Sequence, residues 1–373
     1  MAASFSSKRS LPCLLLLAIF LHGRCSSATP RRIAAGDVAD TDGAMMVERF
    51  RRWKAEYNRS YAAAEEERRR FQVYARNVRY IEATNTAAAA GGLTYELGET
   101  AYTDLTNEEF MAMYTAPPPV RPDADDDATT IITTLAGPVE EPRAYVNLSA
   151  GAPASVDWRA SGAVTEVKDQ GRCGSCWAFS TVAVVEGIQK IRKGKLVSLS
   201  EQELVDCDTL DSGCDGGVSY RALQWITSNG GIATRDDYPY TGKADTPCDS
   251  ANLAHHAATI AGFRRVATRS EASLANAVAG QPVAVSIEAG GDNFQHYKKG
   301  VYNGPCGTQL NHGVTVVGYG QEPAAAGGDR YWIVKNSWGK GWGDDGYIRM
   351  KKDVAGKPEG LCGIAIRPSY PLM

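Results

Sequence analysis

The distribution of cysteine constrains the fold of this chain more than any other feature. Of nine cysteines in 373 residues, only Cys13 and Cys25 lie before position 170, and the other seven fall between Cys173 and Cys362. Seven thiols form at most three disulfides, so at least one stays free. A lone thiol in an exported chain is either an unpaired residue or a reactive group.

The N-terminus predicts that the chain is exported. Lys8 and Arg9 precede an apolar run from Leu11 to Leu21, and small residues follow it. This pattern predicts a signal peptide over residues 1–28, with cleavage after Ala28. The run is too short for a bilayer span, and no other stretch reaches about 20 apolar residues, so we expect no membrane contact after signal removal. Disulfides are stable in the compartments that such a chain enters.

The charge of the chain excludes two classes of partner. The formal net charge is −3, with 40 basic and 43 acidic residues. Such a balance gives no basic surface for nucleic acid or anionic lipid. We therefore expect no nucleic-acid partner.

Residues 29–115 read as helical and charged. Phe50, Trp53 and Tyr57 are spaced for one helix face, and residues 65–85 show apolar positions every three or four residues among Glu and Arg. Residues 116–151 break this pattern with a proline run and an aspartate run, which is typical of a flexible linker.

Residues 152–373 should form the globular body, because they contain all seven remaining cysteines and six of the seven tryptophans. Periodicity predicts helices in the first half and strands in the second. A helical half followed by a sheet half indicates an α+β fold with two lobes, and clefts between lobes are common substrate sites. The expected helices are 176–192, 200–206 and 219–229, and the expected strands are 283–287, 313–319, 330–335 and 346–350.

Cys176 is placed where a thiol would be reactive. Glycines at 171 and 174 make a tight loop before it, and a helical pattern begins at Cys176 itself. The partial positive charge at a helix N-terminus favours a thiolate, and a neighbouring imidazolium would favour it further.

Two other motifs resemble parts of this chain by spacing or by letter. Cys173 and Cys176 have the spacing of redox and zinc motifs, but no strand precedes them and no second clustered pair follows. The glycines of 341–346 match a dinucleotide fingerprint by letter, yet the residues after them read as a strand, so no phosphate loop is expected. We therefore expect no metal and no cofactor.

Two further groups of polar residues do not complete a functional motif. Asp206, Asp208 and Asp211 loosely suggest calcium, but Leu210 stands where an EF-hand needs an oxygen ligand. The remaining histidines outside the candidate site show no partner pattern and are expected at the surface or in structural roles: His255, His256 and His296.

The sequence from Cys173 to Trp177, Cys-Gly-Ser-Cys-Trp, resembles the signature of the papain and cathepsin family. That family places a histidine about 130–150 residues downstream, and His312 lies in this window within Asn-His-Gly-Val. Asn336 follows within Lys-Asn-Ser-Trp-Gly, slightly beyond the window. An insertion over residues 322–329 accounts for the longer gap. The resemblance covers essentially all of residues 152–373 and implies the two-lobed papain fold.

The resemblance also implies the roles of single residues. Cys176 would attack the scissile carbonyl, His312 would pair with it and later protonate the leaving amine, and Asn336 would orient the imidazole. Gln170 would donate to the oxyanion beside the Cys176 backbone N–H, and Trp338 would shield the His–Asn bond. The implied disulfides, Cys173–Cys214, Cys207–Cys248 and Cys306–Cys362, leave Cys176 as the free thiol.

The same resemblance implies a substrate-binding surface. Its expected residues are Gly216, Gly217, Val218, Ser219, Ser286, Gly313, Trp338 and Arg367. Ser286 and Gly313 are small, so the pocket for the second residue before the scissile bond should be roomy. Arg367 stands at its far end. The guanidinium either extends into water, or faces inward and rejects basic side chains.

The helical segment resembles the family's inhibitory pro-segment, with Glu66, Arg70, Asn77, Ile81 and Asn85 at the expected spacing. Tyr74 replaces the usual phenylalanine, and the second motif, Gly98 to Asp104, fits only partly. Acid is expected to release the pro-segment as carboxylates such as Glu66 and Asp104 lose their partners, with cleavage between residues 146 and 154. Glycan acceptor sequons occur at Asn58 and Asn147.

These inferences converge on a latent cysteine endopeptidase that hydrolyses peptide bonds through an acyl-thioester. It is expected in a vacuole or lysosome or outside the cell, as a monomer, with peptide substrates, its own pro-segment and cystatin-like inhibitors as partners. The main alternative is a catalytically silent binding or storage relative. Such relatives usually lack the nucleophile, whereas Cys176, His312, Asn336 and Gln170 are all present.

Overall fold

The computed structural model describes residues 35–89, 91, 93–116, 152–249 and 255–373, without the side chains of 35–41 and 89. The chain divides into two compact units, 1–45 and 46–373, and helix α1 (Ala35–Glu56) begins in the first and ends in the second. The predicted signal peptide, nearly all of the linker and Asn147 lie outside the described residues. No helix in the described ranges is long and apolar enough to cross a bilayer.

The two long helices of the pro-segment pack through aromatic rings. Within the second unit, Phe50 and Trp53 on α1 are buried against Tyr74 on α2 (Ala64–Ala89), with ring centroids 5.0 and 5.2 Å from that of Tyr74. The predicted helix faces are therefore confirmed. Tyr74, in place of phenylalanine, uses its hydroxyl to bond the Glu99 carboxylate.

The pro-segment is mainly helical, as expected, and also contains one short strand between the helices. Tyr95–Leu97 forms strand β1, in which Tyr95 and Leu97 are buried and Glu96 is exposed. This alternation has the period of a strand, and β1 finds its hydrogen-bond partner in β5 (Tyr297–Tyr302), far away in sequence. Helix α3 (Asn107–Tyr114) follows, started by a capping box between Thr106 and Glu109.

The helices and strands of the body agree closely with the predicted segments. Except for α7, the elements that were not predicted are short, and several of the strands among them pair with strands far away in the chain. The predicted helices are α4 (Cys176–Lys193), α5 (Glu201–Cys207) and α6 (Ser219–Asn229), and the predicted strands are β4 (Val283–Ile287), β6 (His312–Gln321), β7 (Arg330–Lys335) and β8 (Tyr347–Lys351). The additional elements are β2 (Val156–Asp157), β3 (Gly262–Arg265), α7 (Glu271–Gly280), α8 (Asp292–Gln295) and β9 (Ser369–Leu372).

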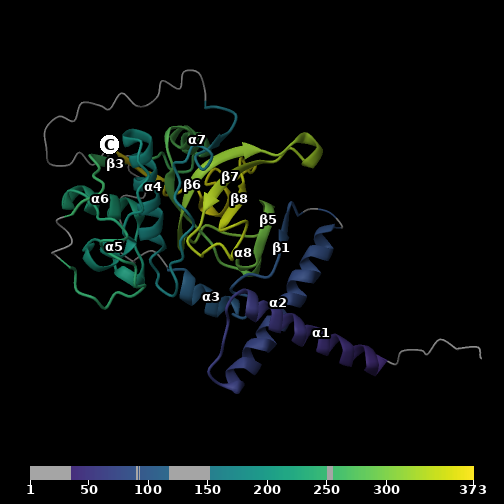
Figure 1. Ribbon diagram of the computed structural model, residues 1–373. Helices are drawn as coiled ribbons and strands as arrows, with labels where there is room; N and C mark the ends of the chain where they lie inside the picture. The colour runs from purple at the N-terminus through teal and green to yellow at the C-terminus, as the bar shows by residue number, and fades with distance from the viewer. Residues whose placement is uncertain (1–34, 90, 92, 117–151, 250–254) are drawn as a thin grey trace, which may run out of the picture. The chain divides into compact units, whose positions relative to one another are not determined.

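One sheet connects all the described strands in the order β1-β5-β8-β7-β6-β4-β9-β3, with β2 paired to β6. Strand β6 lies near its middle, antiparallel to both β4 and β7. All residues of β6 except Gln321 are buried, as expected for a strand covered on both faces. The loop after Gln321, which carries the proposed insertion, forms the exposed end of the β6–β7 hairpin (Figure 1).

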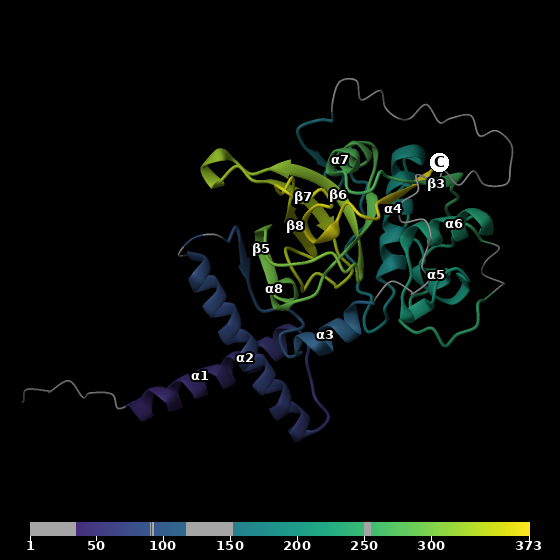
Figure 2. The ribbon, with the colours of Figure 1, turned by 180° about the vertical axis from the view of Figure 1, so that it is seen from behind.

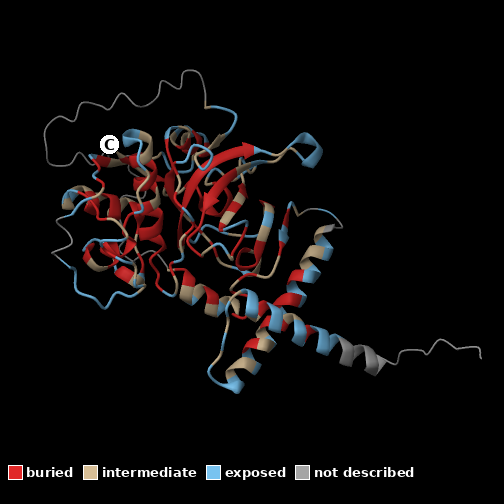
Figure 3. Ribbon diagram, viewed as in Figure 1, coloured by how far each residue is buried: buried red, intermediate tan, exposed pale blue. Residues whose placement is uncertain are grey.

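Two hydrophobic cores confirm the two-lobed α+β fold. One surrounds the sheet and contains Trp332 and Trp342, and the other surrounds α4 and contains Trp177 and Ile226. The rear view separates the helices α4, α5 and α6 from strands β6 to β8 (Figure 2). The burial colouring shows α4 and β6 as largely buried (Figure 3).

The start of α4 lies directly against β6. A Cβ atom on Gly313 would lie 3.1 Å from the Cys176 carbonyl oxygen and 3.0 Å from Ser180 Oγ. Any larger side chain would therefore push the two elements apart. The absence of a side chain at 313 lets the N-terminus of a helix in one lobe meet the first residues of a strand in the other.

Candidate active site

The lobes bring Cys176 and His312 to one cavity. Cys176 is the first residue of α4 and His312 is the first residue of β6. Both line a cavity together with Gly217, Val218 and Ser286. Among the described residues Cys176 is the free cysteine, because disulfides join Cys173–Cys214, Cys207–Cys248 and Cys306–Cys362.

The orientation of the His312 ring is set by Asn336, immediately after β7. His312 Nε2 lies 2.7 Å from Asn336 Oδ1. A carbonyl oxygen only accepts hydrogen bonds, so Nε2 must carry a proton, and Nδ1 is the basic nitrogen of the neutral ring. Trp338 stacks on the ring with a centroid distance of 4.4 Å and an interplanar angle of 25°. The tryptophan thus covers one face of the imidazole.

Gln170 is fully buried beside the same strand end. Its Oε1 accepts a hydrogen bond from Ser337 Oγ at 2.6 Å. Its Nε2 donates to the Cys173 carbonyl at 2.9 Å and to the Tyr114 carbonyl at 3.4 Å. In this form of the protein, the amide that was expected to serve an oxyanion is therefore directed toward a backbone oxygen of the pro-segment.

The end of the pro-segment and the first residue of the linker cover the cavity. Ala116, two residues after α3, lines it beside Cys176, and its N–H donates to the Asn311 carbonyl at 2.9 Å. Trp338 Nε1 donates to the Tyr114 carbonyl at 3.3 Å, and Phe110 packs edge-on against the Trp338 ring at 4.9 Å. The end of α3 thus occupies the hydrogen-bond donors around the thiol.

Burial reverses the expected charge state of the Cys–His pair. Burial raises the pKa of Cys176 to about 11, although backbone N–H groups at the helix start oppose it. Burial also lowers the pKa of His312 to about 4, despite the hydrogen bond that its Nε2 donates to Asn336. The helix start does favour the thiolate, as expected, but in the covered site desolvation outweighs it. Both groups are neutral here.

The other expected substrate-binding residues take different positions. Gly217, Val218, Ser286 and Gly313 line the cavity with the thiol, as does Leu310, which the sequence analysis did not single out. Ser219 is directed to α4, where its Oγ lies 2.7 Å from Ser180 Oγ. The Gly216 carbonyl accepts from Ser212 N, and the half-buried Arg367 is not among the residues that line the cavity.

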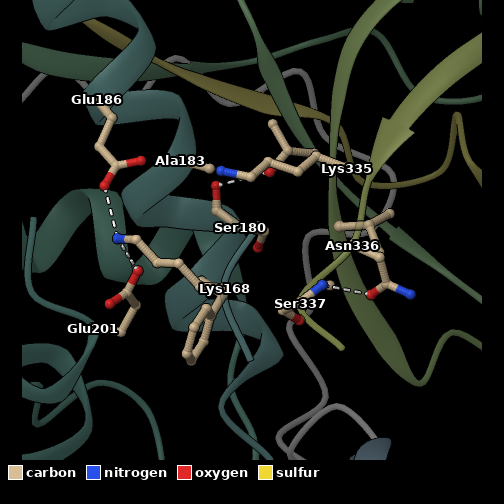
Figure 4. Close-up of a pocket in the computed structure, with 12 residues that line it drawn as sticks. Lys168, Ser180, Ala183, Glu186, Glu201, Lys335, Asn336 and Ser337 are labelled. Atoms are coloured by element: carbon tan, nitrogen blue, oxygen red, sulfur yellow. Dashed lines mark hydrogen bonds and ion pairs between the residues drawn. The ribbon is translucent and has the colours of Figure 1, made fainter. Parts of the chain in front are cut away.

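A buried ionic cluster behind Asn336 was missed by the sequence analysis. Lys168 lies between Glu186 on α4 and Glu201 on α5, with Nζ 2.8 and 2.6 Å from their carboxylates (Figure 4). Lys335, which immediately precedes Asn336, donates to Thr165 Oγ1 at 2.8 Å. The signal that could have revealed it is Glu186, a charge in the otherwise apolar run from Val184 to Ile188.

No group of three or more His, Cys, Asp or Glu side chains within the described ranges is arranged to hold a metal ion. Asp206 instead accepts hydrogen bonds from Gln202 and from the Tyr238 hydroxyl. His255 and His256 are exposed, as expected. His296 is completely buried, so a surface position for it is excluded.

Comparison with known families divides the chain into two regions. A model described as the papain family cysteine protease matches residues 152–372, and one described as the cathepsin propeptide inhibitor domain matches residues 50–110. The senescence-specific cysteine protease SAG12 of Arabidopsis thaliana is 46% identical over 328 residues, which cover 88% of this chain and 90% of that protein. Cysteine endopeptidase RepA of Oryza sativa subsp. japonica is 46% identical over 335 residues, covering 87% and 84%.

Solved structures of precursors resemble the whole described chain. The recombinant stem bromelain precursor matches with a TM-score of 0.75 and 43% identity, over 88% of this chain and 99% of that one. The proform of Amb a 11, a cysteine protease and ragweed pollen allergen, matches with a TM-score of 0.75 and 40% identity, over 88% and 94%. This chain therefore belongs to the papain family of cysteine proteases and carries that family's propeptide inhibitor domain ahead of the peptidase domain.

Proposed function

We propose that this protein is the latent precursor of a cysteine endopeptidase in which Cys176 is the nucleophile and His312 its general base and acid. The observation that carries the proposal is the bond from His312 Nε2 to Asn336, because it leaves Nδ1 as the basic nitrogen in the cavity that holds the only free thiol among the described cysteines. The proposed precursor consists of a signal peptide (1–28), a pro-segment (29–115), a linker (116–151) and the mature enzyme (152–373).

The reaction would begin when the pro-segment leaves the cleft. His312 Nδ1 takes the thiol proton, and Cys176 Sγ attacks the scissile carbonyl carbon. The Cys176 backbone N–H and Gln170 Nε2, once it is freed from the Tyr114 carbonyl, donate to the oxyanion. The imidazolium then protonates the leaving amine as the C–N bond breaks. Water, deprotonated by His312, hydrolyses the acyl-thioester and restores the thiol.

Latency would depend on the pro-segment remaining folded. Glu66 pairs with Arg70 at 2.8 Å, and Asp104 accepts from the Tyr61 hydroxyl at 2.7 Å. Both pairs lie within the pro-segment itself. Acid would therefore loosen its internal structure rather than break ion pairs with the enzyme, and the nick between residues 146 and 154 would follow.

The specificity of the mature enzyme is proposed from the cavity wall. Val218, Ser286 and Gly313 leave a roomy, partly apolar space for the second residue before the scissile bond. Weak cleavage with a basic residue at that position is expected if Arg367 turns toward bound substrate. Arg367→Glu should then increase cleavage of substrates with arginine at that position. A wild-type enzyme that prefers arginine over leucine there would rule out the inward-facing guanidinium.

The expected setting is the secretory pathway, ending in an acidic vacuole or lysosome or outside the cell. The mature enzyme is proposed to act as a monomer and to be inhibited by cystatin-like proteins. Asn58, exposed enough to accept a glycan, would be lost with the pro-segment.

The test uses the full precursor, activated at acid pH. Cys176→Ser should abolish peptidase activity with the fold intact, because a hydroxyl is far less acidic than a thiol, and Asn336→Ala should reduce activity less. An epoxide thiol reagent should label Cys176 only after activation. A catalytically silent relative would show neither peptide hydrolysis nor labelling, and that result would refute the proposal.

A further inference from the structure

Two carboxylates lie behind one wall of the cleft, one on the buried Asp208 and one on the half-buried Asp211. Asp208 and Asp211 belong to the loop between α5 and the 3-10 helix Gly213–Asp215. Asp208 Oδ1 accepts from Leu210 N at 2.8 Å, and Asp211 Oδ1 accepts from Val218 N at 2.9 Å. The second oxygen of each carboxyl, Oδ2, is buried without a hydrogen-bond partner among the described protein groups that could donate to it.

Asp211 is in direct contact with the cavity wall. Gly217 and Val218 line the cavity that holds Cys176. A Cβ atom on Gly217 would lie 2.8 Å from both Cβ and Cγ of Asp211, and 2.5 Å from Cδ2 of Trp177. The backbone of this wall is therefore packed against Asp211 and Trp177 and bonded to the Asp211 carboxylate, so the position of that carboxylate sets the position of the wall.

The two unpartnered Oδ2 atoms belong to carboxyls three residues apart in one loop, and a hydrogen bond between two carboxyls requires a proton between them. Burial raises the pKa of both, and the charge of Asp208 raises the pKa of Asp211 further. Arg221 on α6 opposes this with its positive charge. Of the neighbouring acids, Asp206 on α5 is bonded to Gln202 and Tyr238, and Asp215 is exposed. A shared proton satisfies both buried Oδ2 atoms.

We propose that Asp211 is a positioning residue for substrate binding, which holds the Gly217–Val218 wall of the cleft through the Val218 N–H and is itself held by a proton shared with Asp208. The inference rests on the proposed function, since it assumes that this cavity receives the substrate. When the pair loses its proton, two adjacent buried negative charges repel, and the wall moves. Substrate binding then weakens, while Cys176, His312 and Asn336 are not displaced.

The test is the pH dependence of KM and kcat for the mature enzyme, measured with a fluorogenic peptide amide that has leucine as the second residue before the scissile bond. For wild type, KM should rise roughly tenfold between about pH 6 and pH 9. The pH dependence of kcat should instead follow the titration of Cys176 and His312. Asp211→Asn should keep a low KM and abolish this rise. Its amide oxygen still accepts from Val218, and its NH₂ group donates permanently to Asp208.

Asp211→Ala removes the acceptor and should raise KM roughly fivefold to tenfold at every pH, with kcat within about twofold of wild type. Asp215→Asn is the matched control, an exposed acid at the end of the 3-10 helix that follows the loop, and should follow wild type. The inference is overturned if KM of wild type is flat with pH, if Asp211→Asn shows the wild-type rise, or if Asp211→Ala loses kcat instead of KM.

Folding of the variants is checked by thermal melting. If the alanine variant does not fold, the pH dependence of KM for the isosteric Asp211→Asn decides the test. The two proposals also fail differently. If wild type hydrolyses no peptide after activation, the proposed function is wrong. If it hydrolyses peptide with a KM that is insensitive to Asp211, only the positioning role is wrong.

Discussion

Replacing His296 with leucine should make the precursor resist activation by acid. His296 follows α8, and its carbonyl accepts the N–H of Gly98 from the pro-segment at 2.8 Å. The neighbouring Gln295 donates to the carbonyls of Tyr102 and Leu105 at 3.0 and 3.1 Å. The ring is completely buried, and neither of its nitrogens has a partner among the described residues. The His296 ring is thus buried where the pro-segment docks, and no hydrogen bond from the described residues offsets the loss of its hydration.

The magnitude follows from the pKa of the ring. Burial, helped by the positive charge of Arg76 on α2, lowers the pKa of His296 from 6.5 to about 3. If release of the pro-segment exposes the ring, docking is favoured fully above pH 6.5, and this contribution is lost progressively as the pH falls toward 3. A pH of about 4.5 lies about two pH units below the ordinary pKa of histidine. The docking free energy lost at that pH is on the order of 3 kcal/mol, which is roughly a 100-fold change in the docking equilibrium.

His296→Leu retains an apolar side chain but cannot be protonated, so it should remove this part of the acid response. The assay is hydrogen exchange of the Gly98 amide in the full precursor between pH 7 and pH 4, in a Cys176→Ser background that prevents self-cleavage. The exposed His255→Leu is the matched control. Protection of Gly98 should persist to lower pH in His296→Leu alone. The reasoning is refuted if His296→Leu and the control lose protection at the same pH.

Three other predictions concern the covered site. Phe110→Ala removes a fully buried ring that packs against Trp338, so it should lower the stability of the precursor by roughly 3–5 kcal/mol, measured by thermal melting. It should also cause premature peptide hydrolysis at neutral pH, without changing the mature enzyme. Glu109→Gln should flatten the acid response only below about pH 4.5. Partial burial opposes ionisation of its carboxyl, but the Thr106 backbone and Arg70 hold its pKa below that ordinary value. Its contribution to stability is therefore present above pH 4.5 and lost below it. An unchanged activation profile below pH 4.5 would contradict this. Iodoacetamide should label Cys176 of the precursor at a rate that still rises at pH 10, because burial raises the pKa of the thiol to about 11. Equal labelling rates for the precursor and the mature enzyme would exclude a covered, neutral thiol in the precursor.

The sequence by itself determined the parts of this protein that depend on local order. Apolar periodicity predicted α6 over 219–229 and β4 over 283–287 with the observed bounds. The odd number of cysteines required an unpaired thiol, and the motif around Cys176 placed it at a helix start. Each of these features is decided within a few residues, either by the period of a helix or strand or by a fixed motif.

Only the tertiary structure decided which groups are covered, because burial depends on segments far away in the chain. Strand β1 is too short to stand out from the helical pattern around it, and it exists by pairing with β5 some 200 residues later. The helix start favours a thiolate at Cys176, but Ala116 covers the thiol, and burial raises its pKa against that effect. His296 and Asp211 have unremarkable sequence neighbours. Their unusual environments arise where the pro-segment meets α8 and where the Gly217 loop is packed against α4, and local sequence does not encode either contact.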